Sequence, residues 1–185
     1  MLGDIAQFIL DTLIQPYAGL LLLRFHLQWL RAPMRNPLGE FVMLLTDPLV
    51  RPARRLIPAI RMFDTASIAL AFMVELAFLY ATLLVHGHAL GGWLMPVWAL
   101  LRLLKISIYL LIGALFLEAL LSWTNPHAPF ASVLGSVTRP FLRPLRRLVP
   151  PKGSLDFSFL ILFFLCYIIV SLPLNWLEQL ILGAL

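Results

Sequence analysis

Three ionisable residues lie inside long apolar stretches of the sequence: Arg24, Glu75 and Glu118. A charged side chain near the centre of a membrane costs at least about 2.5 kcal/mol, so such residues are usually paired or take part in ion or proton movement. Arg24 and Glu118 each stand five residues before a tryptophan, Trp29 and Trp123. This spacing predicts equal depth for both and makes them candidates for an ion pair.

Alternatives remain open for each charge. Arg24 lies about 8 Å from the end of its apolar stretch, at 1.5 Å per residue, so it can extend to the membrane boundary or pair with Glu118 or Glu75. Glu75 is deeper. It either holds helices together, paired or protonated, or takes part in ion or proton movement. In the second case the expected polar neighbours are Thr82, Ser107, Ser122 and Tyr167.

A proline- and arginine-rich element occurs twice. Residues 46–58 read Thr-Asp-Pro-Leu-Val-Arg-Pro-Ala-Arg-Arg-Leu-Ile-Pro. A similar segment follows 92 positions later and reads Thr-Arg-Pro-Phe-Leu-Arg-Pro-Leu-Arg-Arg-Leu-Val-Pro. Arginine suits two-point contact with phosphate, and each basic residue beside a membrane attracts anionic lipid by about 1 kcal/mol. We expect headgroup binding, or else docking of a cytoplasmic partner. The motif residues are Pro48, Pro52, Arg54, Arg55, Pro58, Pro140, Pro144, Arg146, Arg147 and Pro150.

The same segments carry signals for helix ends. Asn36 followed by Pro37 predicts the start of a short amphipathic helix. Beyond it, each proline removes a backbone donor and crowds the preceding turn, so we expect rigid, segmented loops and no continuous helix. Asp64 and Asp156 directly precede apolar stretches, where a carboxylate accepts hydrogen bonds from the first helix amides.

Residues for enzymatic or cofactor chemistry are not recognisable in the sequence. It has no nucleophile elbow, phosphate-binding loop or zinc-binding His-Glu-x-x-His motif, and His86-x-His88 alone is a weak metal signal. Cys166, the one cysteine, lies in an apolar run, where we expect a small buried side chain. We therefore expect no enzyme, catalytic residue, metal or cofactor.

The composition assigns these residues to a membrane protein. Of 185 residues 61% are hydrophobic and 12% charged, against about 25% charged in soluble domains. About 20 apolar residues cross a bilayer. Four stretches qualify, roughly 17–30 with a lead-in from 8, 66–85, 106–123 and 157–177. An amphipathic segment before the first predicts an interfacial helix that bends into the span near Pro16.

The basic residues predict the orientation. Eleven of the 14 lie in residues 31–65 and 124–156, against four acidic ones, so these loops should be cytoplasmic and both termini on the outer side. Because the arginines follow membrane boundaries and lack an aromatic stacking platform, we expect no nucleic acid. Residues 89–105 cannot be a fifth span without reversing the second loop. We expect them to form a connector at the outer interface, with Trp93 and Trp98 as anchors.

The chain is thus predicted to be an all-α polytopic protein of two parallel-repeat helical hairpins, residues 1–88 and 106–185, joined by the connector 89–105. The duplicated element, Asn36-Pro37 and Gly153-Ser154-Leu155-Asp156-Phe157-Ser158 resemble the YggT family of small membrane proteins, also called the YlmG family. The first repeat departs from this pattern at Arg61-Met62-Phe63-Asp64, which lacks the glycine that the second repeat has at Gly153.

The resemblance implies four spans and a bacterial inner membrane, or plastid membranes in photosynthetic eukaryotes. Such proteins are linked to osmotic or ion tolerance, to division and envelope organisation, and in plastids to thylakoid organisation or haem attachment. We expect a non-enzymatic protein that organises or assembles membrane components and whose basic loops contact anionic lipid or a cytoplasmic or membrane protein partner. The alternative is an ion-transport or osmotic-stress component, expected to be a homo-oligomer because four helices leave little room for a pore.

Overall fold

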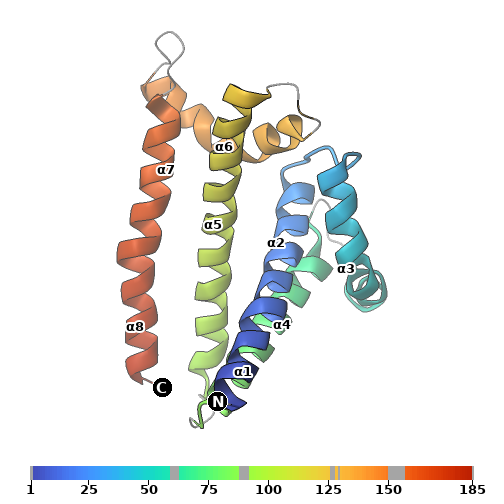
Figure 1. Ribbon diagram of the computed structural model, residues 1–185, viewed down its shortest axis with the longest axis vertical. Helices are drawn as coiled ribbons and strands as arrows, with labels where there is room; N and C mark the ends of the chain where they lie inside the picture. The colour runs from blue at the N-terminus through green and yellow to red at the C-terminus, as the bar shows by residue number, and fades with distance from the viewer. Residues whose placement is uncertain are drawn as a thin grey trace.

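The computed structural model describes residues 2–58, 63–87, 92–125, 128, 130–149 and 157–184. Within these residues the regular structure is helical throughout (Figure 1). The expectation of an all-α protein is confirmed. In chain order the helices are α1 (Leu2–Ile9), the π-helical turn η1 (Leu10–Ile14), α2 (Gln15–Trp29), α3 (Pro37–Leu56), α4 (Thr65–Val85), α5 (Leu94–Thr124), α6 (Ala131–Leu148), α7 (Phe157–Ile169), the π-helical turn η2 (Val170–Leu174) and α8 (Asn175–Ala184).

Four helical runs are long and apolar enough to cross a membrane, in agreement with the predicted polytopic class. They comprise residues Gly3–Trp29, Thr65–Val85, Leu94–Ser122 and Phe157–Gly183. The two chain ends lie at the same end of the bundle (Figure 1). This arrangement follows from an even number of spans. The side of the membrane on which the termini lie stays a prediction.

The N-terminal segment differs from the separate interfacial helix expected from its pattern. α1 continues through η1 into α2, and Gly3 packs against Val85 at the end of α4. The π-helical turn ends one residue before the Gln15–Pro16 pair. Because proline has no amide hydrogen for the preceding turn, a local π-turn accommodates it without ending the helix. A second π-turn contains Pro173 in the last span.

The connector expected over residues 89–105 is also different. From Leu94 onward it forms the first part of α5, a single helix of 31 residues. Trp98, expected as an interfacial anchor, is 6% exposed, whereas Trp93 is exposed. The expectation treated this stretch and the third apolar stretch as separate elements. In the structure they form one helix, and acidic side chains of neighbouring helices neutralise Arg102 and Lys105. Residues 88–91 lie outside the described part of the chain.

The two basic segments are continuous helices, so the prediction that prolines would segment them is wrong. α3 contains Pro48 and Pro52, and α6 contains Pro140 and Pro144. All four prolines are exposed. Since each pair is spaced by four residues, the carbonyls left without a donor lie on one outer face, where water or lipid headgroups can reach them.

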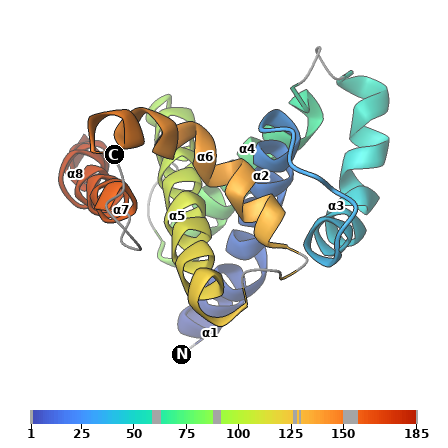
Figure 2. The ribbon, with the colours of Figure 1, turned by 90° about the horizontal axis from the view of Figure 1, so that it is seen from above.

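Opposite the prolines, each of these helices buries one stripe of side chains. The stripe of α3 is Val42, Thr46 and Val50, and the stripe of α6 is Leu134, Thr138 and Leu142, with every member at most 4% exposed. The members recur every four residues, which places them on one helix face. These stripes fix α3 against α2 and α4, and α6 against α5, α7 and α2. Seen from above, α6 lies across the end of the bundle (Figure 2).

Candidate functional site

The first cluster of buried charges surrounds Arg24 on α2, which is 3% exposed. One guanidinium nitrogen donates to the hydroxyl of Thr46 at 2.7 Å and to the carboxylate of Asp47 at 2.8 Å. Its Nε lies 3.5 Å from Asp64 Oδ2. Arg24 therefore does not pair with Glu118 or Glu75, and that expectation is wrong, whereas its extension toward the membrane boundary stays a prediction. Two carboxylates of its own half stabilise it instead.

Asp64 is the centre of this cluster and is 1% exposed. Its carboxylate accepts hydrogen bonds from Arg54 at 2.8 and 3.3 Å and from the hydroxyl of Ser67 at 2.5 Å. The residue stands at the N-cap of α4, but its side chain accepts no bond from the helix amides, contrary to the capping expectation. The arginine and serine donors occupy its oxygens. Asp156, its counterpart, lies outside the described residues.

The surroundings of Asp64 and Asp47 both favour ionised carboxylates. For Asp64, burial opposes ionisation, but hydrogen bonds from Arg54 and Ser67 and the charges of Arg54 and Arg24 outweigh it, and the pKa is lowered. For Asp47, partial burial is likewise outweighed by the hydrogen bond and charge of Arg24 and by Arg51, and the pKa is lowered. Both groups are therefore counter-ions to arginine at neutral pH.

The predicted start of the first amphipathic helix is confirmed. Asn36 Oδ1 accepts a 3.0 Å hydrogen bond from the amide of Gly39, and Pro37 is the first helical residue. Gly39 is required here because a Cβ at that position would lie 2.3 Å from the carbonyl oxygen of Met34. This close approach fixes how the chain turns from α2 into α3.

The second cluster lies between α4, α5 and α8. Glu75 is fully buried, and its Oε1 lies 2.5 Å from Nε of Arg102. The guanidinium of Arg102 also sits over the ring of Phe78, 5.0 Å from its centre, a favourable cation–π arrangement. The expectation of a paired Glu75 is therefore met, but by a partner that the sequence reasoning had placed in a connector.

The cluster extends to the last span through Glu178. The ammonium group of Lys105 donates to Glu178 and, at 2.7 Å, to the side-chain oxygen of Asn175. Trp98 Nε1 donates to the other oxygen of Glu178 at 2.9 Å. Arg102 and Lys105 thus pair with carboxylates from two different spans. α5 is therefore connected by charge to both α4 and α8.

Glu118, the third predicted charge, belongs to neither cluster. It accepts a hydrogen bond of 2.5 Å from the hydroxyl of Thr138, which is fully buried on α6. Thr138 is the counterpart of Thr46 in the repeat, so Glu118 stands where Arg24 stands in the first half. The predicted equivalence of these two positions agrees with this geometry, but the three predicted charges are not brought together.

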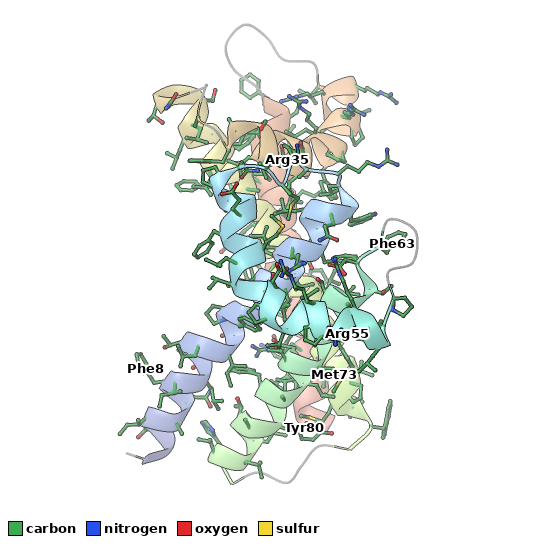
Figure 3. All side chains as sticks on the ribbon, turned by 90° about the vertical axis from the view of Figure 1, so that its right-hand side faces the viewer. Phe8, Arg35, Arg55, Phe63, Met73 and Tyr80 are labelled. Atoms are coloured by element: carbon green, nitrogen blue, oxygen red, sulfur yellow. The ribbon has the colours of Figure 1, made fainter. Side chains whose placement is uncertain are left out.

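The basic motif residues occupy the exposed faces of α3 and α6. Figure 3 shows Arg35 just before α3 and Arg55 near its end, well apart along the side of the bundle. Arg55 and Arg147 are exposed, as is Arg146, and Pro58 accepts a 2.7 Å hydrogen bond from Thr65 through its carbonyl oxygen. Pro150 lies outside the described residues.

Sequence reasoning missed four charged residues of the two clusters as site residues: Asp47, Arg102, Lys105 and Glu178. A usable signal existed for the last three, because the four charges of Glu75, Arg102, Lys105 and Glu178 in apolar surroundings sum to zero. Among the described residues no group of three or more His, Cys, Asp or Glu is arranged to hold a metal ion. Cys166 is buried, as expected.

Comparison with known proteins gives consistent matches over nearly the whole chain. The profile of the CCB3/YggT family matches residues 3–85 and 97–177, one match in each half. Uncharacterized protein PA0392 of Pseudomonas aeruginosa is 34% identical over 94% of this chain and 90% of its own length. Uncharacterized protein YggT of Escherichia coli is 38% identical over 88% and 85%, respectively. No solved structure matches.

Proposed function

The chain belongs to the CCB3/YggT family, and from that premise we propose that it is a non-enzymatic scaffold that organises or assembles components of the bacterial inner membrane. Its two amphipathic helices lie at the cytoplasmic boundary, where their arginines contact anionic lipid or a protein partner. Both termini then lie on the periplasmic side, as the distribution of basic residues favours. The bacterial origin of the relatives supports the location.

The observation that carries this proposal is the pairing of the buried charges. Arg24 and Glu75 are 3% and 0% exposed, and each contacts an opposite charge on a neighbouring helix. A residue that conducts ions lines a water-filled path, whereas a residue that holds helices together is enclosed with its partner. The enclosed pairs favour a rigid scaffold on which α3 and α6 are displayed.

A second candidate function, ion or proton movement linked to osmotic tolerance, is supported by one detail of the same cluster. Glu75 Oε2 is buried and has no hydrogen-bond partner within the described residues, and the same holds for Thr82 Oγ1, two turns further along α4. A carboxylate oxygen without a donor can take a proton or a cation. Because four spans leave little room for a pore, this candidate requires a homo-oligomer.

Flux through reconstituted protein distinguishes the two candidates. Proteoliposomes with the wild-type chain and with Glu75→Gln are loaded with pH- and potassium-sensitive dyes, and assembly of each variant is measured in parallel. We expect no proton or potassium flux above that of empty liposomes from either protein. The control is Met73→Leu on the exposed face of α4. Wild-type flux that Glu75→Gln abolishes while the protein still assembles would contradict the scaffold proposal.

The scaffold proposal also requires a positive result. In nanodiscs that contain phosphatidylglycerol and phosphatidylcholine, spin-labelled phosphatidylglycerol should be enriched beside the protein, because juxtamembrane arginines attract anionic headgroups. Salt at high concentration should reduce the enrichment by screening. Equal amounts of both lipids beside the wild-type protein at low salt would rule out lipid contact as the role of these helices.

A further inference from the structure

The two amphipathic helices have diverged in charge, although they are repeats of one another. α3 carries three arginines and two acidic residues, Glu40 and Asp47, whereas α6 carries four arginines and no acidic residue. The decisive position is Asp47, whose counterpart 92 residues later is Arg139. The first helix therefore has a small net charge and the second a large one.

Two of the three arginines of α3 are paired with carboxylates of the protein itself. Arg51 lies 2.6 Å from Asp47, and Arg54 lies 2.8 Å from Asp64. Asp47 and Asp64 also neutralise the buried Arg24. Arginines that are engaged with carboxylates in this way have less to gain from a phosphate group, because a new contact replaces an existing one.

The arginines of α6 are arranged differently. Arg139, Arg143 and Arg147 recur every four residues, which aligns them in a ridge about 12 Å long. All three are exposed, and the helix positions place them on a different face from the buried stripe of Leu134, Thr138 and Leu142. Within the described part of the chain no carboxylate lies within ion-pair distance of this arginine ridge.

An apolar flank of α6, separated from the ridge by the prolines, indicates which anion the ridge meets. Phe141 and Leu148 are 37% and 81% exposed on the flank between the prolines and the buried stripe. Large apolar side chains on an interfacial helix lie among acyl chains, while arginines on the polar face reach the headgroup layer. The helix also lies across the ends of the spans (Figure 2). These features favour lipid over a soluble acidic protein.

We propose that the α6 ridge, formed by Arg139, Arg143 and Arg147, is the anionic-lipid site of the protein, and that α3 contributes structural charge instead. This inference rests on the proposed scaffold function and specifies its lipid contact. The ligand is a lipid with a phosphodiester headgroup and net negative charge, such as phosphatidylglycerol. The arginine guanidinium groups bind its phosphate oxygens through charge-assisted hydrogen bonds.

The test compares two triple variants of equal charge in nanodiscs of phosphatidylglycerol and phosphatidylcholine. Arg139→Gln/Arg143→Gln/Arg147→Gln removes the α6 ridge, and Arg35→Gln/Arg51→Gln/Arg55→Gln removes three exposed arginines of the first half. We expect enrichment of spin-labelled phosphatidylglycerol to fall at least about fivefold in the α6 variant and less than about twofold in the control. If the triple α6 variant does not assemble, the same enrichment is measured for the three single variants of Arg139, Arg143 and Arg147.

Every other outcome contradicts the inference, and the outcomes remain distinguishable from failure of the scaffold function. An equal fall in lipid enrichment in both triple variants refutes the assignment to α6 but not lipid contact. The same holds for a fall only in the variant that lacks Arg35, Arg51 and Arg55. Absence of enrichment around the wild-type protein refutes both the assignment to α6 and lipid contact itself. Unchanged lipid enrichment in the α6 variant, combined with lost binding of a glutamate-rich helical peptide, would instead assign the ridge to an acidic protein.

Discussion

Arg24 on α2 donates a 2.7 Å hydrogen bond to the buried hydroxyl of Thr46 on α3. The second half of the chain reproduces this contact with the opposite charge, because Thr138 on α6 donates to Glu118 on α5. A hydroxyl group can both donate and accept, so a threonine at this position serves either partner. Both repeats thus have a contact between their first span and the threonine of their amphipathic helix. The charged side chain in this contact is an arginine in the first repeat and a glutamate in the second.

Replacing Arg24 should destabilise the protein strongly. Arg24→Met leaves Asp47 and Asp64 short of a counter-ion in a buried site, and breaking such a cluster costs about 3–5 kcal/mol of unfolding free energy. The unfolding free energy is measured by denaturant titration in detergent. The control Arg55→Gln, on an exposed side chain, should change it by less than about 0.5 kcal/mol. Equal stability of Arg24→Met and wild type would show that the Arg24 pairs are not structural.

The Glu75–Arg102 pair should behave as one unit. Glu75→Ala and Arg102→Met each leave a buried charge without its partner and should each cost about 3–5 kcal/mol, whereas the double variant should cost less than the sum. A double-mutant cycle on unfolding free energies measures this coupling. Additive effects would mean that the two side chains do not contribute through their contact.

Stability should depend on pH through Asp64. Because the folded-state pKa of Asp64 lies below its usual value, the carboxylate stabilises the fold fully above the unfolded pKa of about 3.9 and loses this effect as pH falls through the folded pKa. Asp64→Asn should therefore be less stable than wild type at pH 7, and the difference should shrink on acidification. Melting curves between neutral and acidic pH test this. Glu40→Gln, on an exposed side chain, is the control, and a difference that is constant with pH would contradict the prediction.

Two glycine-to-alanine substitutions should have opposite effects on the stability of the protein. Gly39→Ala places a methyl group 2.3 Å from the backbone oxygen of Met34 and should cost about 1–3 kcal/mol. Gly113, inside α5, has open space around its missing side chain, so Gly113→Ala should stabilise the helix by about 0.5–1 kcal/mol. Thermal denaturation of both variants in the same detergent provides the comparison. A stable Gly39→Ala variant would refute the tight turn between α2 and α3.

The lone cysteine should report on the last span. Cys166 is buried against α5 and α6 with Leu115, Leu142 and Leu162. A maleimide should therefore react with it slowly in the folded protein and rapidly in denaturant. In the α6 ridge variants, a labelling rate equal to that of wild type would verify that α6 and α7 remain packed. Fast labelling of the native wild-type protein would show that α7 separates from the bundle.

The spans and the repeat could be predicted because they depend on composition and on residue identity at a fixed offset. The charge partners could not, because pairing depends on where each helix begins. Arg102 and Lys105 look like residues of a boundary, and only the extension of α5 back to Leu94 places them beside Glu75 and Glu178. The low helix propensity of proline likewise predicted that α3 and α6 would be interrupted. Tertiary packing of the buried stripes instead keeps both helices continuous through their prolines.

The lengths of two neighbouring helices have a consequence for the surrounding membrane. α4 has 21 residues and α5 has 31, which correspond to about 31 and 46 Å. A hydrocarbon core about 30 Å thick matches the first and is too thin for the second. The bilayer beside α5 must thicken, or the helix must tilt or emerge from it, at a cost of fractions of a kcal/mol per ångström of mismatch. The mismatch energy of these two helices therefore depends on the thickness of the surrounding membrane, independently of headgroup charge.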